Sequence, residues 1–256
     1  MKMFRGIFLK NDNEIAIMRD ANRIASRILD AMSEAVAPGV PTMRFEEIAQ
    51  DMCLTYKVRP AFQGYMGFPF ALCCSVNEEV VHGFPSTKRF LREGDIVSFD
   101  MGVVHEGFNA DSARTVPVGK VAPEVATLLT TTRESLYKGI EAAVVGNTVA
   151  HISAAVEAHA RKNNLAVIRR FVGHGVGRTL HEKPEIPNFA TPFSVSAPLK
   201  PGMTLAIEPM LALGTHEVDI LDDNWTAVTR DRKYAAHFEH SIAITSHGPM
   251  ILSLSE

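Results

Sequence analysis

Residues 94–115, GDIVSFDMGVVHEGFNADSART, form the segment around which the rest of the chain is organised. Two apolar runs flank the turn signal His105-Glu106-Gly107, and this pattern predicts a β-hairpin. In that hairpin we expect Asp100 opposite Asp111, within one position. Like charges directly across a ladder destabilise a sheet, and a cation held between them would reverse the sign. In an isolated pair, however, one aspartate usually faces solvent or caps a turn. Evidence for a cation site must therefore come from the rest of the chain.

The first strand of this hairpin is one copy of an internal repeat. Leu91-x-x-Gly94-Asp-Ile-Val-Ser-Phe-Asp100 matches Leu199-x-x-Gly202-Met-Thr-Leu-Ala-Ile-Glu208 position by position. A helix–break–helix pattern precedes each copy, so the repeat predicts two similar α+β halves about a pseudo-twofold axis. Asp100 and Glu208 would face each other across that axis. No Ser/Gly-rich linker intervenes, and we therefore expect one catalytic domain over residues 1–256, with halves at about 13–120 and 121–256.

The elements of both halves follow from periodicity and breaker residues. Helical spacing predicts helices in the first half at residues 13–36 and from a Thr42 cap, with Glu46 behind it, to about Tyr56. In the second half it predicts helices at 124–145 and from a Thr148 cap to about Lys162. Further strands are expected at residues 71–76, 166–172, 204–207 and 241–245.

Composition describes an ordinary globular protein. The chain has 256 residues, 46% of them hydrophobic, and a net charge of −3, which argues against nucleic acid as the main ligand. Its three cysteines, Cys53, Cys73 and Cys74, form no C-x-x-C pattern and predict no disulfide framework, which favours a reducing compartment. The first residues contain no apolar signal region, and no run approaches the roughly 18 apolar residues of a membrane span. We expect a cytoplasmic protein.

Two more candidates join Asp100, Asp111 and Glu208. His174 lies in Gly173-His174-Gly175-Val176-Gly177, and Glu239 stands at the start of an apolar strand. Taken singly, such a histidine is usually a hydrogen-bonded loop residue and such a glutamate is usually solvated. Together, four carboxylates and one imidazole exceed what a core holds uncompensated, and two divalent cations would satisfy all five.

With these residues in place, the chain resembles the type I methionine aminopeptidases. The resemblance runs from about residue 12 to the C-terminus and rests on Asp100 and Asp111 eleven apart, the glycine loop around His174, Ile207-Glu208-Pro209, Phe238-Glu239-His240, Asn77-Glu78-x-Val80-x-His82-Gly83 and His181-Glu182-x-Pro184. It implies the α/β (α+β) pita-bread fold, with two pseudo-symmetric halves around a central antiparallel sheet. We expect neither a zinc-binding N-terminal extension nor the insertion of the type II enzymes, so the chain resembles the minimal bacterial form.

The resemblance also implies roles for these side chains. Asp100 would chelate one metal ion, Asp111 and Glu239 would bridge two, and His174 and Glu208 would complete the second sphere. The donor set suits Mn²⁺, Fe²⁺ or Co²⁺, with Zn²⁺ also open. A water bridging the two ions would attack the scissile carbonyl, with Glu208 as the proton shuttle. His82 and His181, the family's non-ligand histidines, would hydrogen-bond the scissile amide.

The methionine pocket is where the sequence departs from the family. Tyr65, Cys73 and Trp225 fall at pocket positions, although two small residues in a buried strand is an equally good reading of Cys73-Cys74. The family's usual residues are replaced at three places, namely by Met66 for His, by Leu180 for Phe, and by Ala235-Ala236-His237 for Ser-Ala-Gln.

The resulting prediction is removal of the initiator methionine from nascent chains whose second residue is small. One alternative is an X-Pro aminopeptidase or dipeptidase, which normally carries a separate N-terminal domain. Another is an inactive pita-bread binding module, which would have lost metal ligands. The implied partners are nascent N-termini, with transient ribosome contact, and the family expectation is a monomer. The charged residues between Asp219 and Lys233 are read as a solvated loop rather than a basic docking surface.

Overall fold

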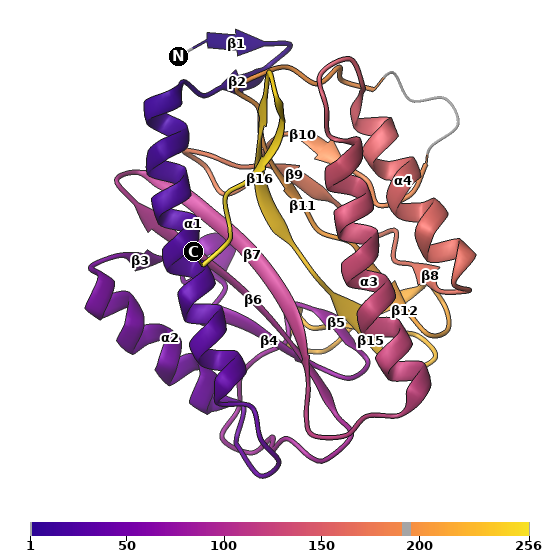
Figure 1. Cartoon of the computed structure of the whole chain (residues 1–256). Coiled ribbons are helices and arrows are strands. Elements are labelled where there is room, and N and C mark those ends of the chain that lie inside the picture. Colours follow the sequence, from indigo (N-terminus) through magenta and orange to yellow (C-terminus); the bar gives the residue numbers. More distant parts are fainter. Residues whose placement is uncertain (1, 191–195, 256) are drawn as a thin grey trace.

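The computed structural model describes residues 2–190 and 196–255. Two helix pairs, one from each half of the chain, lie against the central strands (Figure 1). The first pair is α1 (Asp12–Glu34) and α2 (Met43–Tyr56), and the second is α3 (Pro123–Ala142) and α4 (Val149–Lys162). The predicted helix–break–helix pattern is therefore confirmed in both halves. None of these described helices combines the length and apolar character that a membrane crossing requires.

One of the two predicted helix caps is wrong. Thr42 precedes α2 but has helical dihedral angles (φ −63°, ψ −22°) and makes no capping bond. Its hydroxyl instead accepts the Ser86 N–H at 2.9 Å, and Glu46 accepts the Ala71 N–H at 3.0 Å. Both side chains bind backbone groups far away in the sequence, and a capping motif read from neighbouring residues cannot show such contacts. Thr148 does cap α4, with extended dihedral angles and an N–H that donates to His151 Nδ1 at 3.1 Å.

The first half of the chain forms a sheet around the predicted hairpin. The hairpin strands are β6 (Ile96–His105) and β7 (Phe108–Pro117), and β6 also pairs with β3 (Arg59–Pro60) and β4 (Leu72–Val76). Its turn contains only Glu106 and Gly107, with φ values of 47° and 78°. Two consecutive positive φ angles are typical of the tight turn that matches strand twist, and they pair His105 with Phe108.

That short turn corrects the predicted register. Asp111 pairs with Gly102, and Asp100 pairs with Ala113, so the two aspartates are offset by two positions rather than at most one. Side chains alternate between the faces of a sheet, so an offset of one would have separated the carboxylates. The offset of two instead places Asp100 and Asp111 diagonally on the same face, within reach of a common ligand.

The second half contains a five-stranded antiparallel sheet, in the order β10 (Glu182–Ile186), β9 (Gly173–Gly175), β11 (Thr204–Ile207), β16 (His240–Thr245) and β17 (Gly248–Ile251). Strands β11 and β16 confirm the predictions at 204–207 and 241–245. The strand predicted at 166–172 is too long, because β8 covers only Ala166–Val167 and the chain then turns towards β9. Smaller sheets contain β1 (Lys2–Phe4) with β2 (Ile7–Leu9), β8 with β12 (Met210–Ala212) and β15 (Ala235–His237), and β5 (Glu79–Val81) with β14 (Ala227–Thr229) and β13 (Val218–Ile220).

The two halves meet where β7 lies beside β16 (Figure 1). Glu239 N–H donates to Ala113 O at 2.8 Å, Ser112 Oγ donates to Glu239 O at 2.9 Å, and Ser241 Oγ donates to Asp111 O at 2.8 Å. These bonds hold Asp111 of the first half against Glu239 of the second. The expected α/β fold, with similar halves around central antiparallel strands, is confirmed.

Candidate metal centre and active site

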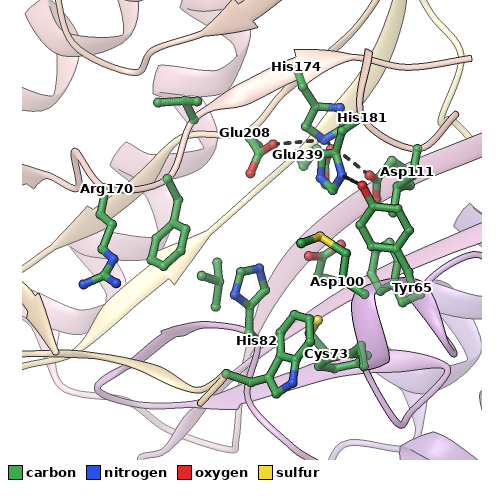
Figure 2. Close-up of a pocket in the computed structure, with 18 residues that line it drawn as sticks. Tyr65, Cys73, His82, Asp100, Asp111, Arg170, His174, His181, Glu208 and Glu239 are labelled. Carbon is green, nitrogen blue, oxygen red and sulfur yellow. Dashed lines mark hydrogen bonds and ion pairs between the residues drawn. The ribbon is translucent and has the colours of Figure 1, made fainter. Parts of the chain in front are cut away.

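A cavity of about 320 Å³ opens between the two halves (Figure 2). All ten residues singled out from the sequence line it: Tyr65, Cys73, His82, Asp100, Asp111, His174, His181, Glu208, Trp225 and Glu239. They come from both halves of the chain and from strands, strand ends and loops. The two acids at the ends of the repeat copies, Asp100 and Glu208, are among them.

The ligand-type atoms converge at the buried end of the cavity. One atom each from Asp111, His174 and Glu239 lies within 4.8 Å of the other two, which is the spacing of residues that could share a metal ion. His174 Nε2 is 3.6 Å from Asp111 Oδ2 and 3.4 Å from Glu208 Oε1. Figure 2 shows these side chains, together with Asp100, turned towards one region.

The protonation state of His174 shows which of its ring nitrogens could bind a metal ion. His174 Nδ1 lies 2.8 Å from the carbonyl oxygen of Gly175, which can only accept, so Nδ1 carries the proton. Burial and the neighbouring His181 lower the pKa of His174 to about 3, so the ring is neutral near pH 7. The lone pair on Nε2 therefore faces carboxylate oxygens, and a cation placed between them would be bound by both.

The four carboxylates support the same conclusion. Asp111 and Glu239 are buried, and Asp100 and Glu208 are largely buried. Burial, with the mutual repulsion of the group, raises the pKa of Asp111, Glu208 and Glu239, and burial raises that of Asp100. Asp100 Oδ1, Asp111 Oδ1 and Glu239 Oε1 have no hydrogen-bond partner among the described residues. Orphaned buried oxygens beside a neutral imidazole fit a divalent metal site.

Two further histidines stand over the cavity. His181 is exposed, and its Nδ1 lies 2.8 Å from the Tyr65 hydroxyl, which leaves Nε2 available to a ligand. His82 has a positive φ of 62°, and its ring packs edge-on against Phe171 and Trp225 at 5.2 and 6.0 Å between centroids. Burial lowers the pKa of His82 to about 4. Near pH 7 it is therefore a neutral hydrogen-bonding group.

The apolar wall of the cavity contains the predicted pocket residues. Trp225 is half-buried and packs edge-on against Phe68 at 5.1 Å between centroids, so the single tryptophan is a wall residue rather than a core residue. Cys73 is buried and lines the cavity, as does Leu180. Met66, another departure from the family, is 82% exposed and lies at the rim.

Three residues that sequence reasoning did not assign to the site bear on its chemistry. Phe171 and Arg170 line the cavity, and His237 lies behind Glu208, with Nε2 3.7 Å from Glu208 Oε2. Of these, only His237 carried a signal, because it replaces the family's usual glutamine. Arg170 and Phe171 lie in a segment that was predicted as strand, and only its tertiary course brings them to the cavity.

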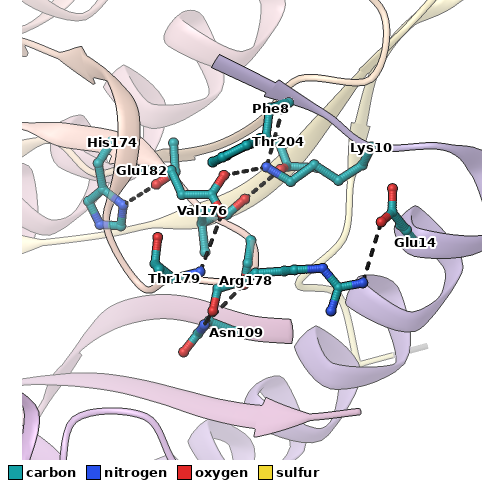
Figure 3. Close-up of polar contacts among 12 residues, drawn as sticks. Phe8, Lys10, Glu14, Asn109, His174, Val176, Arg178, Thr179, Glu182 and Thr204 are labelled. Atoms are coloured by element: carbon teal, nitrogen blue, oxygen red, sulfur yellow. Dashed lines mark hydrogen bonds and ion pairs between the residues drawn. The ribbon is translucent and has the colours of Figure 1, made fainter. Parts of the chain in front are cut away.

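A network of polar contacts supports the loop that runs from β9, which carries His174, to His181 (Figure 3). Lys10 Nζ lies 2.5 Å from Glu182 Oε2, and both side chains are almost fully buried. Asn109 Nδ2 donates to the carbonyl oxygens of Gly177 and Arg178 at 3.0 and 3.1 Å. The loop is thereby tied to the N-terminal segment and to the hairpin, which limits the movement of His181 next to Glu182.

We expect Lys10→Met to destabilise the protein by about 3–5 kcal/mol, because it leaves the buried Glu182 carboxylate without a counter-charge. The double variant Lys10→Met, Glu182→Leu should recover most of that loss, since an apolar pair needs no charge compensation. Urea denaturation of the two variants and the wild type gives both numbers. An equal loss in the single and double variants would contradict the role assigned to the ion pair.

The charged segment near residues 217–233 is internally paired. Arg230 contacts Glu217 at 2.7 Å and Asp219 at 3.3 Å, and all three side chains are about half exposed. The charged side chains are therefore solvated, as the sequence predicts, but the segment is not simply a loop, because Asp219 lies on β13 and Arg230 follows β14.

Comparison with known proteins gives three results. The sequence profile described as metallopeptidase family M24 matches residues 16–246. The methionine aminopeptidase of Clostridium acetobutylicum is 44% identical over 250 residues, which cover 98% of this chain and all of that protein. The crystal structure of a methionine aminopeptidase from Thermotoga maritima superposes with a TM-score of 0.94 at 41% identity, covering 96% of this chain and 99% of that one.

A more distant likeness concerns the fold alone. The prolidase from Pyrococcus furiosus superposes with a TM-score of 0.76 at 22% identity, and the match covers 97% of this chain but 66% of the prolidase. The chain therefore shares its fold with proline-specific peptidases, while its sequence is close to the methionine aminopeptidases.

Proposed function

Because this chain belongs to metallopeptidase family M24 and to its methionine aminopeptidases, we propose that it removes the initiator methionine from polypeptides whose second residue is small. The observation that carries the proposal is the single cavity in which four carboxylates and a neutral imidazole converge beside an aromatic wall. The carboxylate end attracts a free amine, which favours an aminopeptidase over an endopeptidase. The wall formed with Tyr65, Cys73 and Trp225 suits a thioether side chain.

We further propose that the cluster holds two divalent cations. Asp100 would bind one, Asp111 and Glu239 would bind both, and His174 and Glu208 would bind the second. The donor set is compatible with Mn²⁺, Fe²⁺, Co²⁺ and Zn²⁺. When bound, such cations lower the pKa of a water molecule towards neutrality and polarise a carbonyl group.

The protein's own groups would then handle the proton and the amide. Glu208, whose pKa is raised by burial, would accept a proton from the attacking water and deliver it to the leaving amine. His82 and His181 would hydrogen-bond the scissile amide. Desolvation at the cavity wall lowers the pKa of each ring, although part of His181 stays exposed, so both are neutral near pH 7. Neutral donors suit this task because they leave the net charge of the ligand cluster unchanged.

The alternatives differ in what they require of the cavity. A binding module has no need of four convergent carboxylates, which cost stability when they are buried without a cation. An X-Pro peptidase shares the fold, but the sequence likeness lies with the methionine enzymes. We propose a single catalytic unit that acts as a monomer on nascent N-termini in the cytoplasm, with transient ribosome contact. The three free, buried cysteines are consistent with a reducing compartment.

The decisive assay compares cleavage of Met-Ala-Ser with cleavage of an Ala-Pro peptide. The enzyme is first stripped with a chelator and then supplied with Mn²⁺, Fe²⁺, Co²⁺ or Zn²⁺ separately. We expect no activity in the chelated enzyme, and release of methionine from Met-Ala-Ser once a suitable metal is restored. Cleavage of only the proline peptide would contradict the assignment as a methionine aminopeptidase. Cleavage without metal would contradict the metal-dependent mechanism. Tight stoichiometric binding of two ions per chain, measured by elemental analysis, checks the metal count.

A further inference from the structure

Arg170 is an unpaired cation at the mouth of the cavity. Its side chain is exposed, and it is the only lysine or arginine among the lining residues that the structure describes. Neither an ion pair nor a side-chain hydrogen bond joins it to any part of residues 2–190 or 196–255. Figure 2 shows its guanidinium group apart from the four carboxylates, on the side of the cavity opposite Tyr65.

The neighbouring Arg169, unlike Arg170, has partners within the protein. Its guanidinium lies 3.8 Å from Glu157 and 5.3 Å from the centre of the Phe189 ring. Both arginines are exposed, yet only Arg170 lines the cavity. The pair therefore contains one cation held by the protein's own groups and one that is free to meet a ligand.

The position of Arg170 indicates which residues of a bound peptide it would meet. The free amine must lie at the carboxylate end, and the scissile amide must lie near His82 and His181, so later residues leave through the mouth. Phe171 packs against His82 at 5.2 Å between ring centroids, and Arg170 is its neighbour in the chain. Consecutive Cα atoms are about 3.8 Å apart. Arg170 also lines this cavity and is exposed, so the residues that follow the small second residue would pass it as they leave.

We propose that Arg170 is a specificity-determining residue that favours an acidic side chain within the third to fifth residues of the substrate. The proposal rests on the proposed methionine aminopeptidase function and adds a substrate class to it. A carboxylate on the departing peptide would complete an ion pair that the protein itself leaves open. An ion pair at such an exposed rim changes binding by about two- to fivefold, because water screens it and both side chains lose freedom.

The test uses peptides built on Met-Ala-Ser-Ser-Ser amide, with Glu or Lys placed in turn at position three, four or five. The C-terminal amide removes a competing carboxylate. For each position, kcat/KM for the Glu peptide is divided by kcat/KM for the Lys peptide. In the wild type we expect a ratio above one, by about two- to fivefold, for at least one position. Arg170→Glu should invert that ratio, and Arg170→Gln should bring it between the two.

Arg169→Glu is the matched control, because it makes the same charge change one residue away and outside the cavity. It should leave the ratio within error of the wild type. The wild-type preference should also fade as salt rises, since the Debye length falls from about 30 Å at 0.01 M to about 3 Å at 1 M. An equal ratio in the wild type and Arg170→Glu, or an equal shift in Arg169→Glu, would overturn the inference. Absence of methionine release from every peptide would overturn the proposed function and, with it, this inference.

Discussion

Asp111→Asn is expected to make the metal-free protein harder to unfold while it destroys most of the activity. Asp111 is buried among three other carboxylates and has an oxygen with no partner in the described residues. Replacing it by a neutral amide of the same shape removes like-charge repulsion from a site of low dielectric. We expect a gain on the order of 1 kcal/mol in the free energy of unfolding, since one unit of pKa shift corresponds to about 1.4 kcal/mol.

The same variant should lose more than about a hundredfold in cleavage of Met-Ala-Ser. Loss of groups that merely orient a metal ligand costs about 10- to 100-fold, and an amide is a poorer ligand than the carboxylate it replaces. Thermal unfolding in the presence of a chelator measures the stability change, and initial rates after metal is restored measure the activity. Added metal should raise the melting temperature of the wild type more than that of the variant, because only the native wild-type site binds tightly.

Asp95→Asn is the matched control for this prediction. Asp95 is also buried, but its oxygens accept hydrogen bonds from Asn77 Nδ2 and from Arg92 N–H, both at 2.8 Å. An asparagine at this position would turn its own NH₂ group towards one of these two donors. Asp95→Asn should therefore lower the free energy of unfolding by about 1–3 kcal/mol. If chelated Asp111→Asn proves less stable than chelated wild type, the four carboxylates are not repelling one another and the cation site loses its main physical support.

Gly175→Ala is expected to damage both the fold and the site. A Cβ atom at this position would overlap the backbone carbonyl oxygen of Lys183, in the strand that pairs with β9. Because backbone cannot swing aside as a flexible side chain can, β9 and β10 must separate locally, at a cost of about 1–3 kcal/mol. His174 precedes the glycine and His181 precedes β10, so both would shift, and a displacement of about 1 Å can cost a hundredfold in rate.

Urea denaturation and kcat/KM for Met-Ala-Ser measure the two effects of Gly175→Ala. Gly139→Ala in α3 provides the control, because its added Cβ meets side-chain methyl groups rather than backbone: those of Val156 at 2.9 Å, Ile207 at 3.3 Å and Ile152 at 3.4 Å. Alanine also has a higher helix propensity than glycine, by about 1 kcal/mol, which offsets the tighter packing. A Gly175→Ala enzyme with wild-type stability and rate would show that the strands can separate without cost, contrary to the role assigned to this loop.

Much of the site could be predicted from local patterns. The helix pairs followed from apolar periodicity, the hairpin from a turn signal between two apolar runs, and the pairing of Asp100 with Glu208 from a ten-residue repeat. The residues His174 and Glu239 were recognised because ligand-type side chains stood in glycine-rich or apolar surroundings. The structure brings all ten predicted residues to one cavity.

Other features depended on contacts that no local pattern contains. Thr42 and Glu46 matched a capping motif, but distant backbone groups bind both side chains: the N–H of Ser86, which follows β5, and the N–H of Ala71, which precedes β4. Arg170 lay in an apolar run that predicted a strand, and the chain instead leaves β8 early and carries the arginine to the cavity mouth. In each case a long-range contact, which is invisible in the neighbouring residues, overrode the local preference.

The 94–115 stretch shows how the two kinds of information divide. The residues of this segment alone predict that a hairpin forms there and that it carries two aspartates of the predicted metal site, because turn residues and apolar alternation act over a few positions. Only the tertiary structure decided that the turn holds two residues, which pairs Asp111 with Gly102 and puts both carboxylates on one face. Only the packing of β7 beside β16 then added Glu239, since that contact joins residues more than a hundred positions apart.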